Sequence, residues 1–262
     1  MKLKLYQIDA FADQVFTGNP AAVCPLTSWL DAPIMQKIAE ENNLAETAFF
    51  VKKGEVFELR WFTPETEVDL CGHATLATAH VIFEHLGYQE NLVKFFSPRS
   101  GELTVKKESD GSLTLDFPVD ETVAIQGVAA INEAIGKEPL KTIKGKTDYL
   151  LIYNSQKEVE AITPNFHLLD QLDCRGVIVS APGDEVDFVS RFFAPQCGIP
   201  EDPVTGSAHT TMIPYWSKAL GKRKLSARQL SSRGGNLICE DLGERVEISG
   251  KAITYLIGEI EI

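Results

Sequence analysis

Cysteine is sparse in this chain and follows no paired pattern. Five cysteines are spread over 262 residues, and no two of them are spaced as C-x-x-C. An odd number without such spacing argues against a disulfide framework and against a zinc ribbon. A chain of this length is long enough for one large domain or two small ones, each with its own core.

Basic charge is also scarce. The chain has 25 Lys and Arg against 37 Asp and Glu, which gives a formal net charge of −12, and it contains no basic run. Binding to nucleic acid needs a basic face for the phosphates, so the composition argues against a nucleic-acid partner. An anionic small molecule is still compatible, because a few backbone N–H groups can hold one locally.

Long apolar runs are absent as well. No stretch approaches the roughly 20 residues that a membrane-spanning helix needs. The N-terminus, M-K-L-K-L-Y-Q-I-D, alternates polar and apolar residues like a β-strand and has no signal-peptide core. With 44% hydrophobic and 24% charged residues, the composition is that of a globular protein. We expect a cytoplasmic protein without a membrane partner.

What the sequence does contain is a long repeat. G-H-A-T-L-A-T-A-H-V-I-F-E-H-L-G at 72–87 and G-S-A-H-T-T-M-I-P-Y-W-S-K-A-L-G at 206–221 share Gly, Ala and a closing Leu-Gly at an offset of 134 residues. The pattern S-x-R-x-G-x-L recurs at 97–103 and 231–237 with the same offset. A period this long indicates a duplicated structural unit rather than a solenoid repeat.

Hydrophobic patterns and turn residues predict the elements of each copy. Strands are predicted at 56–62, 92–97, 102–107, 112–117, 186–193, 237–241, 245–249 and 252–260. Helices are predicted at 31–43, 73–86, 127–136 and 207–220. Pro214 lies inside the last helix and is expected to kink it or to shorten its first part. The segment from Pro118 to Asp148 is interpreted as the crossover between the two halves.

These elements predict an α/β (α+β) fold of two pseudo-symmetric units. Each unit is expected to be a mostly antiparallel sheet wrapped around a central helix, with the active-site cleft between the units. The N-terminal unit is expected to span 1–118, and a last strand at about 252–262 could complete its sheet. The C-terminal unit is expected to span 119–251.

The two repeated helix starts are candidates for binding an anion. A helix N-terminus offers unpaired N–H groups and a partial positive charge, and glycine lets a ligand approach the backbone closely. We therefore expect Gly72–His73 and Gly206–Ser207 to hold a carboxylate. Ser207 could cap its helix and also reach the ligand. In a single copy such a Gly-Ser start is more often only a cap, and the matched second copy favours binding.

A metal site and a two-cysteine racemase site are both disfavoured. His73 and His80 are separated by about 10 Å along a helix, too far for one ion with bonds of about 2 Å. Cys71 at a helix start could act as a base, but Thr205 occupies the matching position in the second copy. Cys71 alone is most simply a small buried residue.

Five motifs together resemble the PhzF family, the phenazine biosynthesis-like proteins that share the diaminopimelate epimerase fold. They are F-T-G-N-P at 16–20, N-L-A-E-T-A-F at 43–49, F-T-P at 62–64, C-G-H-A-T-L-A at 71–77 and E-D-P-V-T-G-S-A at 201–208. The resemblance runs the length of the chain. It implies that both units are diaminopimelate-epimerase-like, that the protein is a homodimer, and that its chemistry needs no metal or organic cofactor.

The resemblance also implies roles for individual residues. In one branch of the family, a glutamate moves a proton between carbons of a small cyclic unsaturated carboxylic acid, and that glutamate resembles Glu46. His73, Asp202 and Ser207 match polar residues around the substrate.

The backbone amides at the two helix starts, residues 72–73 and 206–207, match the family's carboxylate-binding groups. From the residues alone, Glu46 has apolar flanks in L-A-E-T-A-F-F-V and is expected to be partly buried, as suits a general base. Asn19, in Gly-Asn-Pro, is expected to be a turn residue and a secondary candidate for substrate contact.

The sequence leaves three functions open. The leading one is a cofactor-independent isomerase in which Glu46 moves a proton on a small carboxylate-bearing substrate. A second is an epimerase that uses Cys71 as one base. A third is a non-catalytic protein that binds small carboxylates in the same place.

Overall fold

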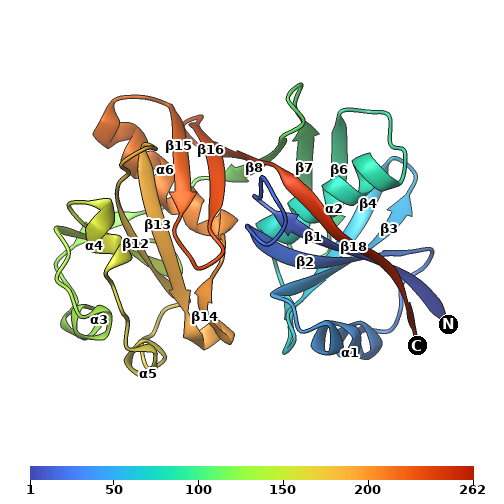
Figure 1. Ribbon diagram of the computed structural model, residues 1–262, viewed down its shortest axis with the longest axis horizontal. Helices are drawn as coiled ribbons and strands as arrows, with labels where there is room; N and C mark the ends of the chain where they lie inside the picture. The colour runs from blue at the N-terminus through green and yellow to red at the C-terminus, as the bar shows by residue number, and fades with distance from the viewer. The chain divides into compact units, whose positions relative to one another are not determined.

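A computed structural model describes residues 1–262, the whole chain. It is a mixed α/β structure with eighteen strands and six α-helices (Figure 1). The chain forms two compact units. The N-terminal unit comprises Met1–Asp116 together with Ser249–Ile262, and the C-terminal unit comprises Phe117–Ile248.

The N-terminal unit consists of eleven elements. They are β1 (Lys2–Ala10), β2 (Asn19–Leu26), α1 (Ala32–Asn42), β3 (Glu46–Lys53), β4 (Val56–Phe62), β5 (Glu67–Val68), α2 (Gly72–His85), β6 (Leu92–Ser97), β7 (Gly101–Lys107), β8 (Leu113–Pro118) and β18 (Ala252–Glu261). The strands pair in the order β18–β1–β2–β3–β4–β6–β7–β8. The β2–β3 and β4–β6 pairs are parallel, and the others are antiparallel. Short β5 adds to β4.

The helix α2 is buried on nearly all sides, as its apolar composition predicts. It contacts β1, β2, β3, β7 and β18 of its own unit. Small side chains let these strands approach, and its buried threonines satisfy their hydroxyls within the helix. Thr75 Oγ1 donates to the Cys71 carbonyl at 2.6 Å and Thr78 Oγ1 donates to the Ala74 carbonyl at 2.7 Å. The hydroxyls of these two buried threonines are therefore paired within the apolar core.

The helix α1 packs on a second core of the same unit. Pro33 lies in its first turn, and Asn43 ends the helix in the left-handed region with φ of 48°. Met35, Ile38 and Ala39 form its buried face. They pack in a cluster with apolar side chains of β1, β2 and β3.

The C-terminal unit consists of fourteen elements. They are β9 (Val123–Ile125), α3 (Ala129–Ile135), β10 (Lys141–Lys144), β11 (Asp148–Ile152), α4 (Gln156–Glu160), α5 (Phe166–Leu169), β12 (Gly176–Pro182), β13 (Phe188–Ala194), the 3₁₀ turn η1 (Pro195–Cys197), β14 (Ile199–Asp202), α6 (Gly206–Leu220), β15 (Lys224–Gln229), β16 (Gly235–Asp241) and β17 (Arg245–Gly250). The strands pair in the order β9–β10–β11–β12–β13–β15–β16, and short β14 adds to β13.

The two units repeat one strand topology. From β18 to β7 the successive pairs are antiparallel, antiparallel, parallel, antiparallel, parallel and antiparallel. From β9 to β16 the succession is the same. A short added strand precedes the long helix in both units. The repeat seen in the sequence is therefore part of a longer structural repeat, in which the order and direction of the strands recur. The residues of most of these strands show no sequence similarity that would reveal it.

The interpretation of 118–148 as a crossover is wrong. This segment holds β9, α3 and β10, and it belongs to the sheet of the C-terminal unit. Its strands are short, and Val123 on β9 is 59% exposed. Such strands lack the alternation of buried apolar residues by which a strand is recognised in a sequence.

The helix α6 is not shortened by Pro214. It begins at Gly206 and runs to Leu220 with the proline inside it. Proline lacks the N–H that would bond to the carbonyl of Thr210. The backbone N–H of Asp120 donates to that carbonyl instead, at 3.3 Å. Asp120 also accepts a hydrogen bond from Thr211 Oγ1 at 2.9 Å, so this residue supports the helix where the proline interrupts it.

Candidate active site

Three elements of the N-terminal unit bring one polar cluster together. Glu46 is the first residue of β3, Asn19 is the first residue of β2, and His73 is the second residue of α2. Because β2 and β3 are parallel and pair from Ala21 and Glu46 onward, their N-terminal ends lie together. We call Asn19, Glu46, Cys71 and His73 the Glu46 cluster.

Contacts within the Glu46 cluster centre on the His73 imidazole. Its Nε2 lies 3.0 Å from Glu46 Oε2, and its Nδ1 lies 3.3 Å from Asn19 Nδ2. Cys71 Sγ lies 3.4 Å from the same Nδ1. The Glu46 and His73 side chains are only 12% and 6% exposed. The predicted partial burial of Glu46 is therefore present, and the carboxylate has a direct partner.

The cluster changes the protonation of two of its members. Burial raises the pKa of the Cys71 thiol to about 11, so the thiol is neutral near pH 7. Burial alone would lower the pKa of His73, but its contacts with Cys71 and Glu46 raise that pKa well above 6.5. With the thiol neutral, the Glu46 carboxylate is the partner that favours the imidazolium. The contact with Glu46 therefore favours the protonated form of the His73 ring.

Asn19 is not a turn residue. It begins β2 and is fully buried. The turn precedes it, where Gly18 has φ of 68° and a Cβ there would meet the Ala10 carbonyl oxygen. An amide can present either its oxygen or its nitrogen to an imidazole, so Asn19 suits His73 Nδ1 with or without a proton.

A second polar cluster lies in the C-terminal unit at the start of α6. Asp202 ends β14, Thr205 precedes the helix, and Gln229 ends β15. Thr205 Oγ1 donates to Asp202 Oδ2. Gln229 Nε2 donates to the Asp202 carbonyl at 2.8 Å, and Gln229 Oε1 accepts from the Thr205 backbone N–H at 2.9 Å. We call these three residues the Asp202 cluster.

One expectation at this second helix start is wrong, and one buried residue there was not expected. Ser207 does not cap α6, because Thr205 is the N-cap residue and Ser207 lies inside the first turn, partly exposed. His209 was not singled out in the sequence. It is fully buried, its Nδ1 lies 2.8 Å from the Thr205 carbonyl, and burial lowers its pKa to about 4. It is a neutral histidine that fixes the backbone before Gly206.

Sequence reasoning also missed Gln229. Its side chain is fully buried and makes three hydrogen bonds to the turn between β14 and α6. Nothing around it in the sequence marks it, since a glutamine at the end of a strand is ordinarily a surface residue. Only the fold brings it to residues 202–205.

The Glu46 cluster is also the one place where metal-binding side chains gather. The ligand atoms of Glu46, Cys71 and His73 all lie within 4.8 Å of one another. However, Glu46 faces one ring nitrogen of His73 and Cys71 faces the other. An ion bound to one nitrogen would lose the ligand on the opposite side, and the raised thiol pKa opposes the thiolate that a metal needs. This arrangement does not fit a metal site.

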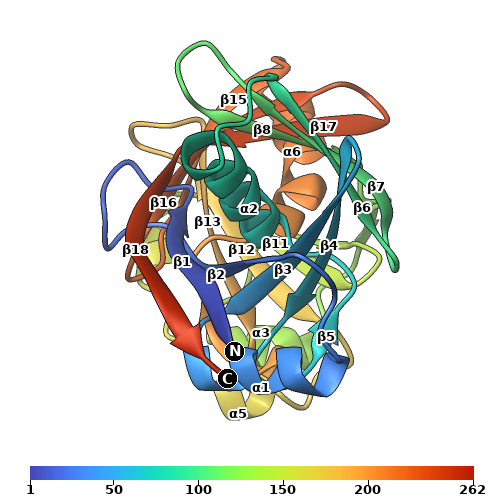
Figure 2. The ribbon, with the colours of Figure 1, turned by 90° about the vertical axis from the view of Figure 1, so that its right-hand side faces the viewer.

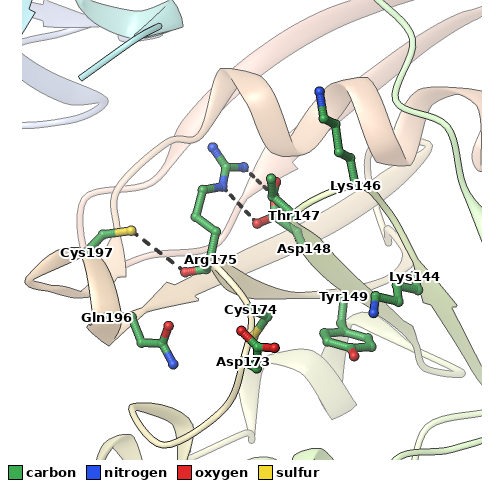
Figure 3. A pocket seen from close by; sticks show the side chains of 10 residues that line it. All are labelled: Lys144, Lys146, Thr147, Asp148, Tyr149, Asp173, Cys174, Arg175, Gln196 and Cys197. Atoms are coloured by element: carbon green, nitrogen blue, oxygen red, sulfur yellow. Dashed lines mark hydrogen bonds and ion pairs between the residues drawn. The ribbon is translucent and has the colours of Figure 1, made fainter.

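A polar cavity of about 490 Å³ lies in the C-terminal unit, and Figure 3 shows the side chains that line it. None of the predicted site residues lines it. Its most buried charges neutralise each other, because Arg175 forms a two-bond ion pair with the Asp148 carboxylate. Lys144 lies over the Tyr149 ring at 5.5 Å. The cavity is therefore not the candidate active site.

Comparisons with known proteins concern the chain as a whole. The chain matches the PhzC-PhzF family model, described as phenazine biosynthesis-like protein, over residues 8–258. An uncharacterized isomerase of Pseudomonas aeruginosa is 50% identical over 262 residues, which cover 100% of both chains. The crystal structure of a PhzF-family phenazine biosynthesis protein from Enterococcus faecalis has a TM-score of 0.96 at 48% identity, and 100% of each chain is covered.

A more distant likeness concerns the fold alone. A hydroxyproline epimerase from Agrobacterium vitis has a TM-score of 0.61 at 11% identity, over 99% of this chain and 92% of that one. The chain belongs to the phenazine biosynthesis-like family, and it is an isomerase of that family. None of its helices is both long and apolar enough to cross a membrane.

Proposed function

We propose that this isomerase moves a proton on a carbon of a small carboxylate-bearing substrate, with Glu46 as the general acid and base. The observation that carries the proposal is the buried contact of 3.0 Å between Glu46 Oε2 and His73 Nε2. A base that takes a proton from carbon must be ionised, sheltered from water and held in one orientation. The contact with His73 fixes the orientation of the Glu46 carboxyl group, and its exposure of only 12% shelters it from water.

In the proposed reaction, the Glu46 carboxylate removes a proton from a carbon activated by the neighbouring unsaturated or carbonyl group. The electron pair left behind shifts into the substrate. Glu46, now protonated, returns the proton to another carbon or to the other face of the same one. His73 Nε2, 3.0 Å from Glu46 Oε2, would hold the carboxyl group in one orientation before and after the transfer. No cofactor takes part.

Backbone amides at helix starts would hold the substrate carboxylate. The first N–H groups of α2, at Gly72 and His73, and of α6, at Gly206 and Ser207, have no partner within their helices. Each helix adds a partial positive charge at that end. Asp202 and the Ser207 hydroxyl would orient polar groups of the substrate. These groups also stabilise negative charge that develops during proton transfer.

We also infer that the two units are copies of one ancestral unit around a central helix. The identical succession of parallel and antiparallel pairs supports this inference. Expression as two chains, 1–118 with the last strand appended and 119–251, is the direct test of whether each folds as a unit.

The decisive experiment follows hydrogen exchange at carbon. A panel of small carboxylic acids is incubated with the protein in heavy water and analysed by mass spectrometry. We expect one class of acid to gain deuterium with the natural protein and Glu46→Gln to lower that rate by about 10²- to 10⁴-fold. The control is Glu40→Gln, at an exposed position on α1. Full exchange by Glu46→Gln would remove Glu46 from the proposed role.

The Cys71 epimerase is the second candidate. Cys71 contacts His73, as a base in the same cluster should. Against it, burial raises the thiol pKa to about 11, so little thiolate exists at neutral pH. We expect Cys71→Ala to keep most of the exchange activity. Loss of exchange in this variant, with Glu46→Gln still active, would favour the epimerase.

A further inference from the structure

Each unit holds an arginine–glutamate ion pair just before its long helix. In the N-terminal unit, Arg60 on β4 pairs with Glu67 on β5. In the C-terminal unit, Arg191 on β13 pairs with Glu201 on β14. Figure 2 shows short β5 beside β4, and Figure 1 shows short β14 at one end of β13. We call these two contacts the Arg–Glu pairs.

The two Arg–Glu pairs have the same geometry. In each, the arginine Nε donates to one carboxylate oxygen at 2.7 Å, and a terminal guanidinium nitrogen donates to the other at 2.9 Å. The four side chains are only 13% to 22% exposed. Hydrogen bonding to Arg60 lowers the pKa of the Glu67 carboxyl, which keeps it ionised. A two-bond contact of this kind fixes the orientation of both partners, whereas an exposed ion pair contributes little.

The Arg–Glu pairs also occupy equivalent positions in the two sheets. Phe62 faces Glu67 across β4 and β5, and Phe193 faces Glu201 across β13 and β14. Each arginine lies two residues before that phenylalanine. Its guanidinium lies over the phenylalanine ring, at 5.2 Å in the N-terminal unit and 4.9 Å in the C-terminal unit. The ring therefore supports the arginine in both units.

The chain between the paired strands differs in length, but the chain after the glutamate does not. The segment from the phenylalanine to the glutamate contains four residues in the N-terminal unit and seven in the C-terminal unit. In both units the glutamate nevertheless lies five residues before the first residue of the long helix, Gly72 or Gly206. The position of the helix start is therefore not set by the loop length. The contact that stays the same is the Arg–Glu pair.

We infer that Arg60 and Arg191 are positioning residues of the proposed active site, and that each places the helix-start amides of its own unit through the glutamate that it binds. This inference rests on the proposed role of those amides in holding a substrate carboxylate. An N–H group binds a carboxylate well only when it points at the oxygen, so a displaced short strand would weaken binding. Asp202 directly follows Glu201, so its position depends on the same pair.

The test measures carboxylate binding with acetate as the probe. Backbone ¹⁵N–¹H chemical shifts report the two helix starts separately, at 72–73 and at 206–207. Glu201→Gln leaves at most one of the two bonds to Arg191, because the amide nitrogen of glutamine is a donor. We expect this variant to raise the acetate Kd at 206–207 by about two- to fivefold and to leave the Kd at 72–73 unchanged. Glu67→Gln should show the reverse.

The sign of the change separates positioning from charge. Each Glu→Gln variant removes a negative charge, which by Coulomb attraction alone would tighten acetate binding. Arg60→Lys keeps the charge but removes the planar fork, so it should weaken binding at 72–73 as Glu67→Gln does. The matched controls are Glu90→Gln and Glu185→Gln, at exposed positions outside the Arg–Glu pairs. Urea denaturation checks that every variant is folded.

Three results would overturn the inference. Unchanged or tighter acetate binding beside the altered pair would show that the pair does not position that helix start. Equal weakening at both helix starts would indicate a general loss of structure. Acetate that shifts neither helix start in the natural protein would remove the role on which the inference rests. Deuterium exchange at carbon is measured separately, so a failure of the role of Glu46 would leave the acetate result standing.

Discussion

At the scale of single residues, the choice of Asn rather than Asp at position 19 matters for the site. Its amide lies 3.3 Å from His73 Nδ1, while the Glu46 carboxylate lies on the other side of the ring. A neutral amide leaves Glu46 as the sole carboxylate of the Glu46 cluster. Proton transfer between the ring and Glu46 then depends on one carboxylate only.

Asn19→Asp should therefore disturb the titration of His73. A second carboxylate on the imidazole would raise the pKa of His73 further. The raised pKa should move the alkaline loss of activity to higher pH. The measurement is ¹⁵N NMR of the ring together with the pH profile of kcat/KM. Asn19→Ala serves as the control, because it removes the contact without adding charge, and an unchanged titration in Asn19→Asp would contradict the contact.

At the scale of elements, the start of α6 depends on a residue from another strand. Gln229 at the end of β15 holds both the Asp202 carbonyl and the Thr205 N–H. These groups belong to the turn that leads into Gly206 and Ser207. The position of the helix-start amides therefore depends on a side chain more than twenty residues further along the chain.

Gln229→Leu should reveal this dependence. Leucine fills a similar volume but leaves a buried N–H and a buried carbonyl without their partner, which costs about 2 to 4 kcal/mol in the free energy of unfolding. Urea denaturation measures the loss. Gln89→Leu, at an exposed position, is the control and should change stability little. A loss of the same small size in both variants would mean that the Gln229 bonds do not support the turn.

The elements differ in how well the sequence predicts them. The ends of the helix α2 and the strand β4 were predicted to within about one residue. Both elements have a pattern of apolar residues that can be recognised in the sequence without knowledge of the fold. The strands β9 and β10 were missed because they are short and depend on neighbours in the sheet. Three members of the Glu46 cluster, Asn19, Glu46 and His73, were singled out from motifs in the sequence, whereas Cys71 was expected to be only a small buried residue. The roles of Gln229 and His209 were not predicted, because only the folded chain brings those side chains to their partners.

At the scale of the whole molecule, buried histidines contribute to the pH dependence of stability. Burial lowers the pKa of His209 and of His80 to about 4 each, so both are neutral in the folded protein. His73 is shifted the opposite way. The lowered pKa values contribute stability above about pH 6.5 that is lost as the pH falls toward 4. The raised value of His73 contributes stability below 6.5 that is lost as the pH rises through its folded pKa.

His209→Asn should make the protein less sensitive to acid. The asparagine amide can replace Nδ1 as donor to the Thr205 carbonyl, and it does not titrate. The lowering of the His209 pKa to about 4 corresponds to about 3 kcal/mol in the free energy of unfolding. The natural protein should lose this stability between pH 6.5 and 4, and the variant should keep it. Urea denaturation at several pH values measures this, with exposed His167→Asn as the control. An unchanged slope in His209→Asn would place the acid sensitivity elsewhere.

The path of the chain has a consequence for synthesis. The sheet of the N-terminal unit ends in β18, which follows the entire C-terminal unit in the sequence. A nascent chain on the ribosome therefore finishes β1 to β8 long before β18 can emerge, and β1 waits with one side open. The unit that carries Glu46 starts first and is completed last. Until then, a chaperone or another nascent chain can reach the apolar edge that β18 later covers.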